Sequence, residues 1–175
     1  QRSRNNLLAE GIAPEKVCVT GNTVIDALFL ARTKILDNPV ISEEMDQKFP
    51  FLRNIGKFLL VTGHRRENFG IGLENICNAI NRLADEDEIG IVFPVHLNPN
   101  VRKSVNKLLG DQPRIHLIEP VEYLSFVYLM NRSYAILTDS GGVQEEAPSL
   151  GKPVLVTRDT TERPEGVESG TVKLV

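Results

Sequence analysis

The feature that most constrains the fold of this chain is a regular alternation, from residue 57 onward, of short apolar segments with helical patterns. Runs rich in Val, Ile and Leu predict six strands, at residues 58–62, 89–95, 115–118, 134–138, 153–156 and 171–174. Between them, helical spacing predicts helices at residues 73–84, 101–109 and 123–131, and a fourth from about residue 143. Short apolar strands that alternate with helices indicate an α/β fold, in which helices cover both faces of a parallel sheet.

The first 56 residues do not follow this alternation. A polar-faced helix ends near Glu10, residues 17–20 predict a short strand, and Gly21 follows as a flexible joint. Thr23 has capping-box spacing and opens a second helix, and Ser42 begins a shorter one. Because the chain opens within a helix and has one strand before a hinge-like glycine, we expect that an upstream domain is missing.

Composition and charge narrow the class of protein. The chain has 175 residues, of which 41% are hydrophobic and 25% are charged, as in an ordinary globular domain. The net charge of −3 comes from acidic and basic residues mixed along the chain, so we expect no nucleic-acid partner. The sequence has no run of 18 apolar residues, so we expect a soluble chain without a membrane partner.

The two cysteines, Cys18 and Cys77, lie far apart, each within an apolar pattern, and the sequence has no CxxC motif. This arrangement favours buried free thiols in a reducing compartment, here the cytoplasm, over a disulfide or a metal site.

A polar glycine turn stands between the fourth predicted strand and the helix that follows it. The turn contains Ser140, Gly141 and Gly142, and Glu145 and Glu146 follow within the first helical turn. The N–H groups of a helix start can bind an anion, and glycine lets a ligand approach the backbone closely. A carboxylate can accept two hydrogen bonds from a ribose diol. The alternative is a tight strand-to-helix turn that holds no ligand.

Other polar loops are expected at the same edge of the sheet, because the carboxyl ends of parallel strands lie together. In such sheets the ligand binds at this edge, where the strand order reverses. The loops carry His64, Arg65, His96 and Arg163. Arginine forms forked, charge-assisted bonds to phosphate oxygens, so arginines and helix-start amides together suit a diphosphate. The motifs GxxxxGK[ST] and GxGxxG do not occur, so neither a P-loop nor a dinucleotide fingerprint is supported.

Histidine and aromatic residues near this edge have two interpretations each. His64 directly follows a strand and a glycine, which favours a functional role over a structural role in the loop. Phe126 or Tyr123 could flank a base, but their helical spacing favours positions in the core.

Five segments together resemble the non-hydrolysing UDP-N-acetylglucosamine 2-epimerases. They are VTGNTVIDAL (19–28), VTGHRRENFG (61–70), PVHLNPNV (94–101), LTDSGGVQEEAPSLGKPVLVTRDTTERPEG (137–166) and GTVKLV (170–175). The resemblance extends in order over essentially the whole chain. It implies two Rossmann-like domains in the glycosyltransferase-B arrangement, with the UDP-sugar in the cleft between them. Residues 1–22 would be the tail of the N-terminal domain and the hinge. Residues 23–175 would be the nucleotide-sugar-binding domain, truncated at its C-terminal end.

The resemblance also implies roles for residues of the predicted turn and the loop near the end of the chain. Ser140, Gly141 and Gly142 match the diphosphate-binding turn of the family, and Glu146 matches its ribose-binding glutamate. Arg163 matches an arginine that contacts the ligand.

Further positions match the base site and the catalytic site of the family. Phe126 matches a residue near the uracil, and Val121 lies where the chain passes the base, with backbone contact expected. His64 matches an active-site histidine. Arg65 and His96 fall where some members bind a second, activating UDP-sugar.

The implied activity is interconversion of UDP-N-acetylglucosamine and UDP-N-acetylmannosamine, without a metal or redox cofactor, for surface polysaccharides. The partners implied are these two nucleotide sugars, the N-terminal domain of the same polypeptide, and a second copy in a homodimer. The acidic residues that handle the C2 proton lie in the missing half, so this chain alone is expected to be inactive. A glycosyltransferase of the same architecture, a hydrolysing relative and a non-catalytic nucleotide-sugar-binding domain remain as alternatives.

Overall fold

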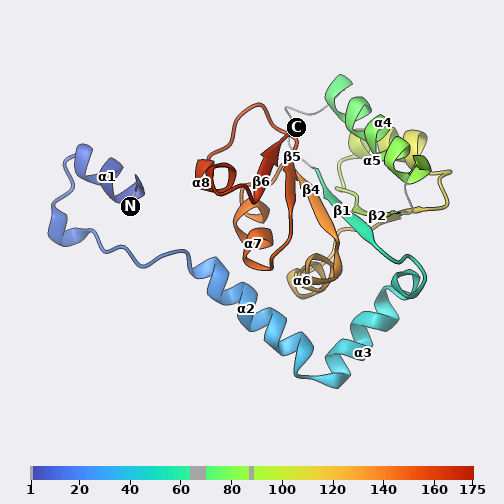
Figure 1. Cartoon of the computed structure of the whole chain (residues 1–175), viewed down its shortest axis with the longest axis horizontal. Coiled ribbons are helices and arrows are strands. Elements are labelled where there is room, and N and C mark those ends of the chain that lie inside the picture. Colours follow the sequence, from blue (N-terminus) through green and yellow to red (C-terminus); the bar gives the residue numbers. More distant parts are fainter. Residues whose placement is uncertain (1, 64–69, 87–88) are drawn as a thin grey trace.

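The computed structural model describes residues 2–63, 70–86 and 89–175, and its centre is one parallel sheet (Figure 1). The sheet has six strands in the order β3-β2-β1-β4-β5-β6. The strands are β1 (Phe58–Thr62), β2 (Gly90–Pro94), β3 (Ile115–Ile118), β4 (Ala135–Thr138), β5 (Val154–Val156) and β6 (Val172–Leu174). All six predicted strands are confirmed to within one residue at each end, and so is the α/β class.

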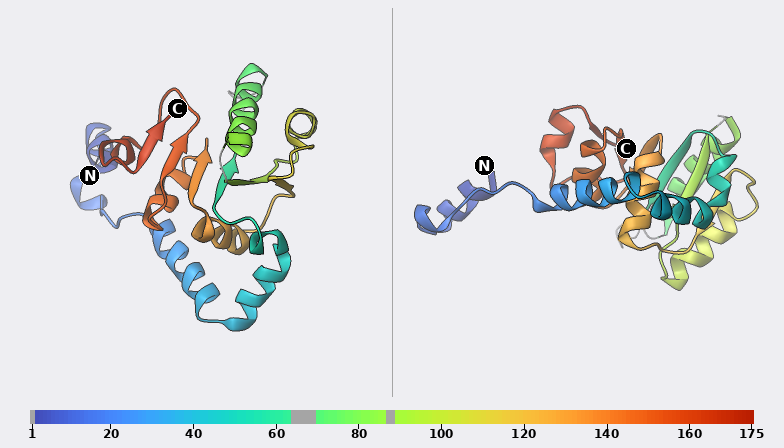
Figure 2. Two further views of the ribbon diagram at one scale, coloured as in Figure 1. Left: turned by 45° about the vertical axis from the view of Figure 1, so that its right-hand side comes forward. Right: turned by 90° about the horizontal axis from the view of Figure 1, so that it is seen from below.

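Helices connect the strands and precede them. The α-helices are α1 (Arg2–Ala9), α2 (Thr23–Leu36), α3 (Pro39–Lys48), α4 (Ile71–Glu86), α5 (Pro99–Leu109), α6 (Tyr123–Arg132), α7 (Val143–Ser149) and α8 (Pro164–Glu168). Two short 3-10 helices, η1 (Pro14–Lys16) and η2 (Pro50–Arg53), complete the described elements. Figure 1 and the right view of Figure 2 show α1 apart from the sheet and from the helices that cover it.

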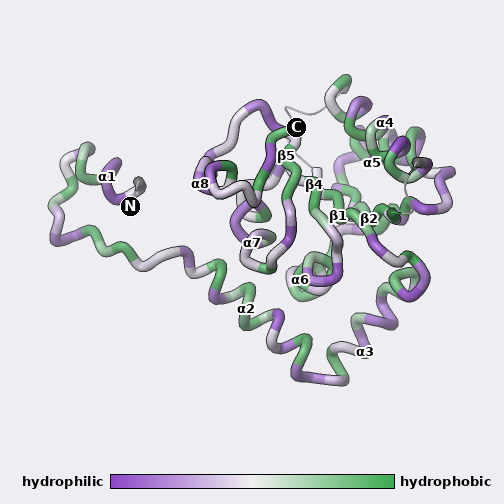
Figure 3. Tube along the Cα trace, in the orientation of Figure 1, coloured by the Kyte–Doolittle hydropathy of each residue, from purple (hydrophilic) through white to green (hydrophobic). Residues whose placement is uncertain are grey.

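The sheet is buried on both faces. Successive side chains of a strand point to opposite sides, and helices cover each side. In β1, Phe58 and Leu60 belong to one apolar cluster, which they share with α2, α3, α6 and α7. Leu59 and Val61 belong to the other cluster, which they share with α4 and α5. Figure 3 shows green, hydrophobic stretches along β1, β4 and β5 in the middle of the sheet. None of the described helices is both long enough and apolar enough to span a bilayer.

The strand order reverses between β1 and β4, which are hydrogen-bonded neighbours in the middle of the sheet. From β1 the chain proceeds outward to β2 and β3, and it then returns to β4 on the other side. The helices that follow β1 and β4, α4 and α7, accordingly pack on opposite faces of the sheet. Ligands of α/β proteins bind at such a reversal of strand order.

The predicted strand at residues 17–20 is wrong, because this segment has no secondary structure. A strand is stable only when a neighbour pairs with its backbone groups, and these residues join α1 to α2 across an exposed stretch. Cys18 is accordingly exposed, against the expectation of a buried thiol. Cys77 is buried as expected, and burial, with a smaller contribution from Glu74, raises its pKa to about 11.

α2 begins at Thr23 as predicted but has a different capping residue, and α3 begins earlier than predicted; in both cases an asparagine caps the helix. The side chain of Asn22, rather than that of Thr23, accepts the N–H of Val24 and caps α2. The next helix begins at Pro39 rather than at Ser42, because the side chain of Asn38 caps it and proline suits the first helical position. The predicted long loop after β5 also contains one unpredicted helix, α8.

Ile80 tests the assignment of the buried face of α4. Its side chain is fully buried, so Ile80→Ala should lower the free energy of unfolding by about 2–5 kcal/mol through lost contacts and a cavity. Ile71 lies on the same helix and is 76% exposed, so Ile71→Ala should change this free energy by less than about 0.5 kcal/mol. Urea unfolding followed by circular dichroism measures both values, and equal losses in the two variants would contradict the assignment.

Candidate functional site

A hollow of about 250 Å³ opens at the carboxyl edge of the sheet, where the strand order reverses. Its walls come from the carboxyl ends of β1 and β2, from the loops after β3 and β4, and from the first turns of α6 and α7. The lining residues are Thr62, Gly63, Pro94, His96, Pro120, Val121, Phe126, Ser140 and Val143. The structure thus brings together four of the predicted site residues, which are His96, Val121, Phe126 and Ser140.

Two threonines fix the backbone at the base of this hollow. Thr62 and Thr138 are the last residues of β1 and β4 and stand opposite each other, and their hydroxyl oxygens are 2.6 Å apart. The Thr138 hydroxyl also accepts the N–H of Ser140 at 3.0 Å. Because Thr138 is fully buried, this pair fixes the position from which the glycine turn leaves the sheet.

Glu146 lies beside the glycine turn and is buried, with 7% of its surface exposed. A carboxylate in the first turn of a helix is commonly exposed, but Glu146 is buried because α7 packs on the sheet with positions 143, 144, 146 and 147 inward. A Cβ built on Gly142 would be 3.8 Å from Glu146 Oε2 and 3.9 Å from Ser140 Oγ. The carboxylate, the serine hydroxyl and the turn therefore form one contiguous polar surface.

The hydroxyl of Tyr123 donates a hydrogen bond of 2.7 Å to Glu146 Oε1. Tyr123 is 45% exposed, so the predicted core position is wrong for this residue, whereas Phe126 is half-buried and lines the hollow. Burial raises the pKa of Glu146, the bond from Tyr123 lowers it, and the charge of Glu145 raises it. Burial and the bond to Glu146 raise the pKa of Tyr123 to about 12, so the phenol stays protonated at neutral pH.

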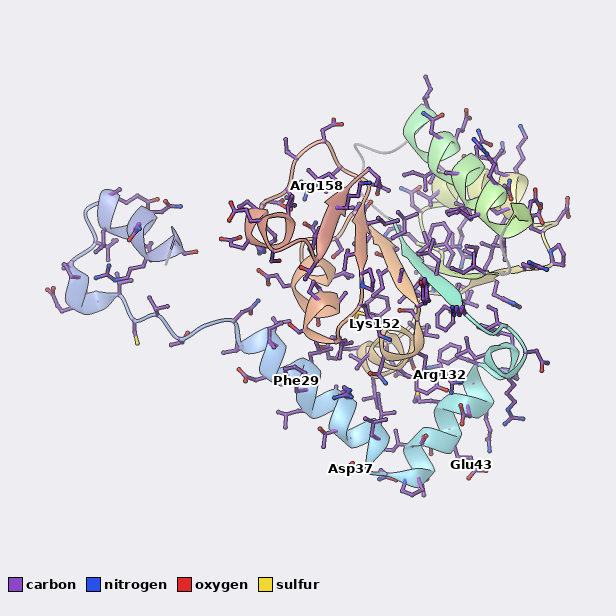
Figure 4. The ribbon with its side chains drawn as sticks, in the orientation of Figure 1. Phe29, Asp37, Glu43, Arg132, Lys152 and Arg158 are labelled. Atoms are coloured by element: carbon purple, nitrogen blue, oxygen red, sulfur yellow. The ribbon has the colours of Figure 1, made fainter. Side chains whose placement is uncertain are left out.

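Arg163 lies next to the same helix through an ion pair between its Nε and Glu145 Oε1. The other oxygen of Glu145 accepts a hydrogen bond from the side chain of Asn22, the residue that caps α2. Glu145 thus links the start of α2 to the segment after β5. A second arginine of that segment, Arg158, pairs with Glu162, and Figure 4 shows it at the carboxyl edge of the sheet.

The three remaining sequence predictions concern His64, Arg65 and His96. His64 and Arg65 lie outside the described residues. His96 lines the hollow, and its Nδ1 accepts the N–H of Asn98 at 3.2 Å. This bond leaves the proton of the neutral ring on Nε2.

A larger hollow of about 530 Å³ lies between α4 and the segment after β5. It is lined by Arg158, Asp159 and Thr160 of that segment, but by none of the residues matched to the binding sites of the family. The smaller hollow is the better candidate, because it lies at the reversal of strand order and gathers the predicted residues. In the part of the chain that the structure describes, no three His, Cys, Asp or Glu residues form a group that could hold a metal ion.

Comparison with known proteins decides the family. The sequence model of the UDP-N-acetylglucosamine 2-epimerase family matches residues 1–175. The chain belongs to this family. It is similar to the UDP-N-acetylglucosamine 2-epimerase of Yersinia pestis, with 57% identity over all of this chain and 47% of the relative. The chain therefore spans about half the length of the curated relatives that it matches.

Solved structures of similar proteins share the fold described above. UDP-GlcNAc 2-epimerase from Neisseria meningitidis, bound to UDP-GlcNAc, superposes with a TM-score of 0.93 at 58% identity, over 99% of this chain and 47% of that chain. The structure of S. aureus MnaA with UDP gives a TM-score of 0.83 at 48% identity, over 98% of this chain and 45% of that chain.

Two features of this candidate site were not predicted from the sequence. The Thr62–Thr138 contact had a usable signal, because two neighbouring strands both end in threonine. The Tyr123–Glu146 bond had none, since it joins two helix starts that only the packed fold brings together.

Thr138→Val tests the threonine contact. Valine keeps the shape of the side chain but removes the hydroxyl that bonds to Thr62 and Ser140, so the free energy of unfolding should fall by about 1–3 kcal/mol. Thr33→Val, at an exposed position of α2, is the matched control and should change little. Chemical denaturation gives both values. A stability equal to that of the parent chain would show that the contact does not hold the turn.

Proposed function

We propose that this chain is the UDP-binding half of a non-hydrolysing UDP-N-acetylglucosamine 2-epimerase, an isomerase that interconverts UDP-N-acetylglucosamine and UDP-N-acetylmannosamine. The observation that carries the proposal is the hollow at the reversal of strand order. It gathers Val121, Phe126 and Ser140 in a chain that matches the epimerase family throughout. Two similar proteins, from N. meningitidis and S. aureus, hold UDP-GlcNAc and UDP respectively.

The geometry supports one orientation of the nucleotide. The uracil lies at Val121 and Phe126, which share the hollow with Ser140. The diphosphate lies at the turn of Ser140, Gly141 and Gly142. The ribose lies between the uracil and the diphosphate, next to Glu146. The Glu146 carboxylate is within van der Waals distance of a Cβ built on Gly142. A ligand could then approach the glycine backbone of the turn closely.

Arg163 is part of the same proposal, as a residue that contacts the ligand. Its pairing with Glu145 places it next to the helix that carries Glu146, one residue along the chain. A guanidinium group that already pairs with one carboxylate can still donate from its remaining N–H groups to a phosphate oxygen.

The reaction requires elimination, because the C2 proton of the sugar has no neighbouring carbonyl and is not acidic enough for simple removal. A base takes the C2 proton, the C1–O bond to the β-phosphate breaks, and UDP leaves behind 2-acetamidoglucal. Protonation of C2 from the other face and return of the UDP oxygen to C1 complete the epimerisation. The residues of this chain stabilise the charge that grows on the β-phosphate, and each well-placed donor contributes about 3–4 kcal/mol.

The remaining roles belong to the proposal as well. His64 acts as a phosphate donor or proton relay, and Arg65 and His96 contact a second, activating UDP-sugar. Residues 1–22 form the tail and hinge of an N-terminal domain that supplies the C2 acid and base, and residues 23–175 form the nucleotide-sugar-binding domain in a glycosyltransferase-B arrangement. The whole enzyme is a homodimer that serves surface polysaccharide synthesis in the cytoplasm, where free thiols such as Cys18 and Cys77 persist.

Incubation of the full-length protein that contains this chain with UDP-N-acetylglucosamine in heavy water tests the reaction. Proton NMR should detect UDP-N-acetylmannosamine with deuterium at C2, because the intermediate is reprotonated from solvent. The 175-residue chain alone should give no turnover, because it lacks the acid and base for C2. Free N-acetylmannosamine with UDP would instead indicate a hydrolysing enzyme. An untouched substrate would favour a glycosyltransferase or a binding domain.

Glu146→Gln tests the ribose site. Because Glu146 is buried, glutamine is a better probe than alanine: it keeps the volume and an acceptor for Tyr123. Loss of the charge-assisted bonds to the diol should weaken UDP binding by about 10- to 100-fold. Glu44→Ala, at an exposed position of α3, is the control and should bind as the parent does. Isothermal titration calorimetry gives the affinities, and an unchanged value for Glu146→Gln would remove this residue from the ribose role.

A further inference from the structure

Tyr123 stands at the candidate site in a position that core packing does not explain. It is the first residue of α6, and its ring is 45% exposed. The helix itself is fixed, because its residues 127–130 are all buried in the apolar cluster. An exposed ring on a fixed helix start therefore holds its hydroxyl at a defined place, 2.7 Å from Glu146 Oε1.

The two oxygens of Glu146 have different surroundings. Oε1 accepts the hydroxyl of Tyr123, whereas Oε2 is the atom that a Cβ on Gly142 would meet, at 3.8 Å. We propose that Tyr123 is a positioning residue for ribose recognition: its hydroxyl fixes the Glu146 carboxylate so that Oε2 faces the diol of a ribonucleotide bound at the glycine turn. This inference rests on the proposed UDP site and adds a residue through which the site selects ribonucleotides over 2′-deoxyribonucleotides.

The charges around Glu146 support a second effect of the same bond. On the same helix, the charge of Glu145 raises the pKa of Glu146, and Glu145 is itself paired with Arg163. From the segment after β5, Glu162 approaches the turn, because its Oε2 would be 3.8 Å from a Cβ on Gly141. From α6, the Tyr123 hydroxyl lowers the pKa. The phenol thus opposes the burial and the acidic neighbour that favour protonation.

The sign of the pH effect follows from these contacts. An ionised carboxylate can accept hydrogen bonds from both hydroxyl groups of a ribose, whereas a protonated carboxyl has lost part of that capacity. Without the Tyr123 hydroxyl, the pKa of Glu146 rises, and the carboxyl protonates at a higher pH. UDP affinity should then begin to fall at a higher pH than in the parent chain.

Tyr123→Phe removes the hydroxyl and keeps the exposed ring. In the whole 175-residue chain, calorimetry with UDP and 2′-deoxy-UDP between pH 5 and pH 9 should give three changes. UDP affinity at neutral pH falls by about 5- to 10-fold, the ratio of UDP to 2′-deoxy-UDP affinity decreases, and the pH midpoint of UDP binding moves upward. Tyr134→Phe, at a ring that is 55% exposed and lies beside Lys57, is the matched control and should change none of these values.

A carbon-detected NMR titration of the Glu146 carboxyl in the ligand-free chain separates this inference from the proposed function. A higher pKa in Tyr123→Phe without any UDP binding by the parent chain would overturn the UDP site and, with it, the selection of ribose, while the positioning bond would stand. Normal UDP binding with an unchanged midpoint and an unchanged ratio of affinities in Tyr123→Phe would overturn the inference alone. Tighter UDP binding in the variant would also overturn it, because Tyr123 would then compete with the ribose for Oε1.

Discussion

The side-by-side pairing of β1 and β4 is the constraint on which the rest of the site depends. It places Thr62 opposite Thr138 at the end of the two strands, and their hydroxyl groups join the strands where the backbone hydrogen bonds of the sheet end. From β1 the chain continues to α4 on one face of the sheet and from β4 to α7 on the other, so a gap opens between the two strand ends. The glycine turn, the start of α6 and the loop after β3 surround that gap and bring their polar groups to it.

The fold could be predicted from the sequence because its signals are local. A strand buried on both faces is a short run of Val, Ile and Leu, and each of the six runs became a strand within one residue of its predicted ends. The edge that carries the site could be predicted for the same reason, since all strands of a parallel sheet end on one side. The resemblance to the epimerases then selected residues such as Val121 and Ser140, which the fold places around one hollow.

Contacts between distant segments could not be predicted in this way. The expected strand at residues 17–20 had suitable residues, but pairing requires a neighbouring strand, and the described chain offers none there. The burial of Glu146 depends on how α7 rests on the sheet, and its bond to Tyr123 depends on the distance between two helices. The cap at Asn22 has a local signal, but Thr23 offered a competing one, and the structure decides between them.

The contact between Asn22 and Glu145 has a mechanical consequence for the segment that precedes α2. Gly21, with a φ of +82°, is the last residue before this contact. The backbone before Asn22 can therefore rotate without disturbing the contact, whereas the backbone after Asn22 cannot. Rotation about the backbone bonds of Gly21 would move residues 2–20 alone. The hydrogen bond between Asn22 at the start of α2 and Glu145 in α7 would stay intact. Rotation about the backbone bonds that follow Asn22 would instead break its hydrogen bond to Glu145. The carboxylate that pairs with Arg163 would then lose one of its two partners. Gly21, the expected flexible joint, is thus next to the residue whose side chain bonds the Glu145 carboxylate that pairs with Arg163.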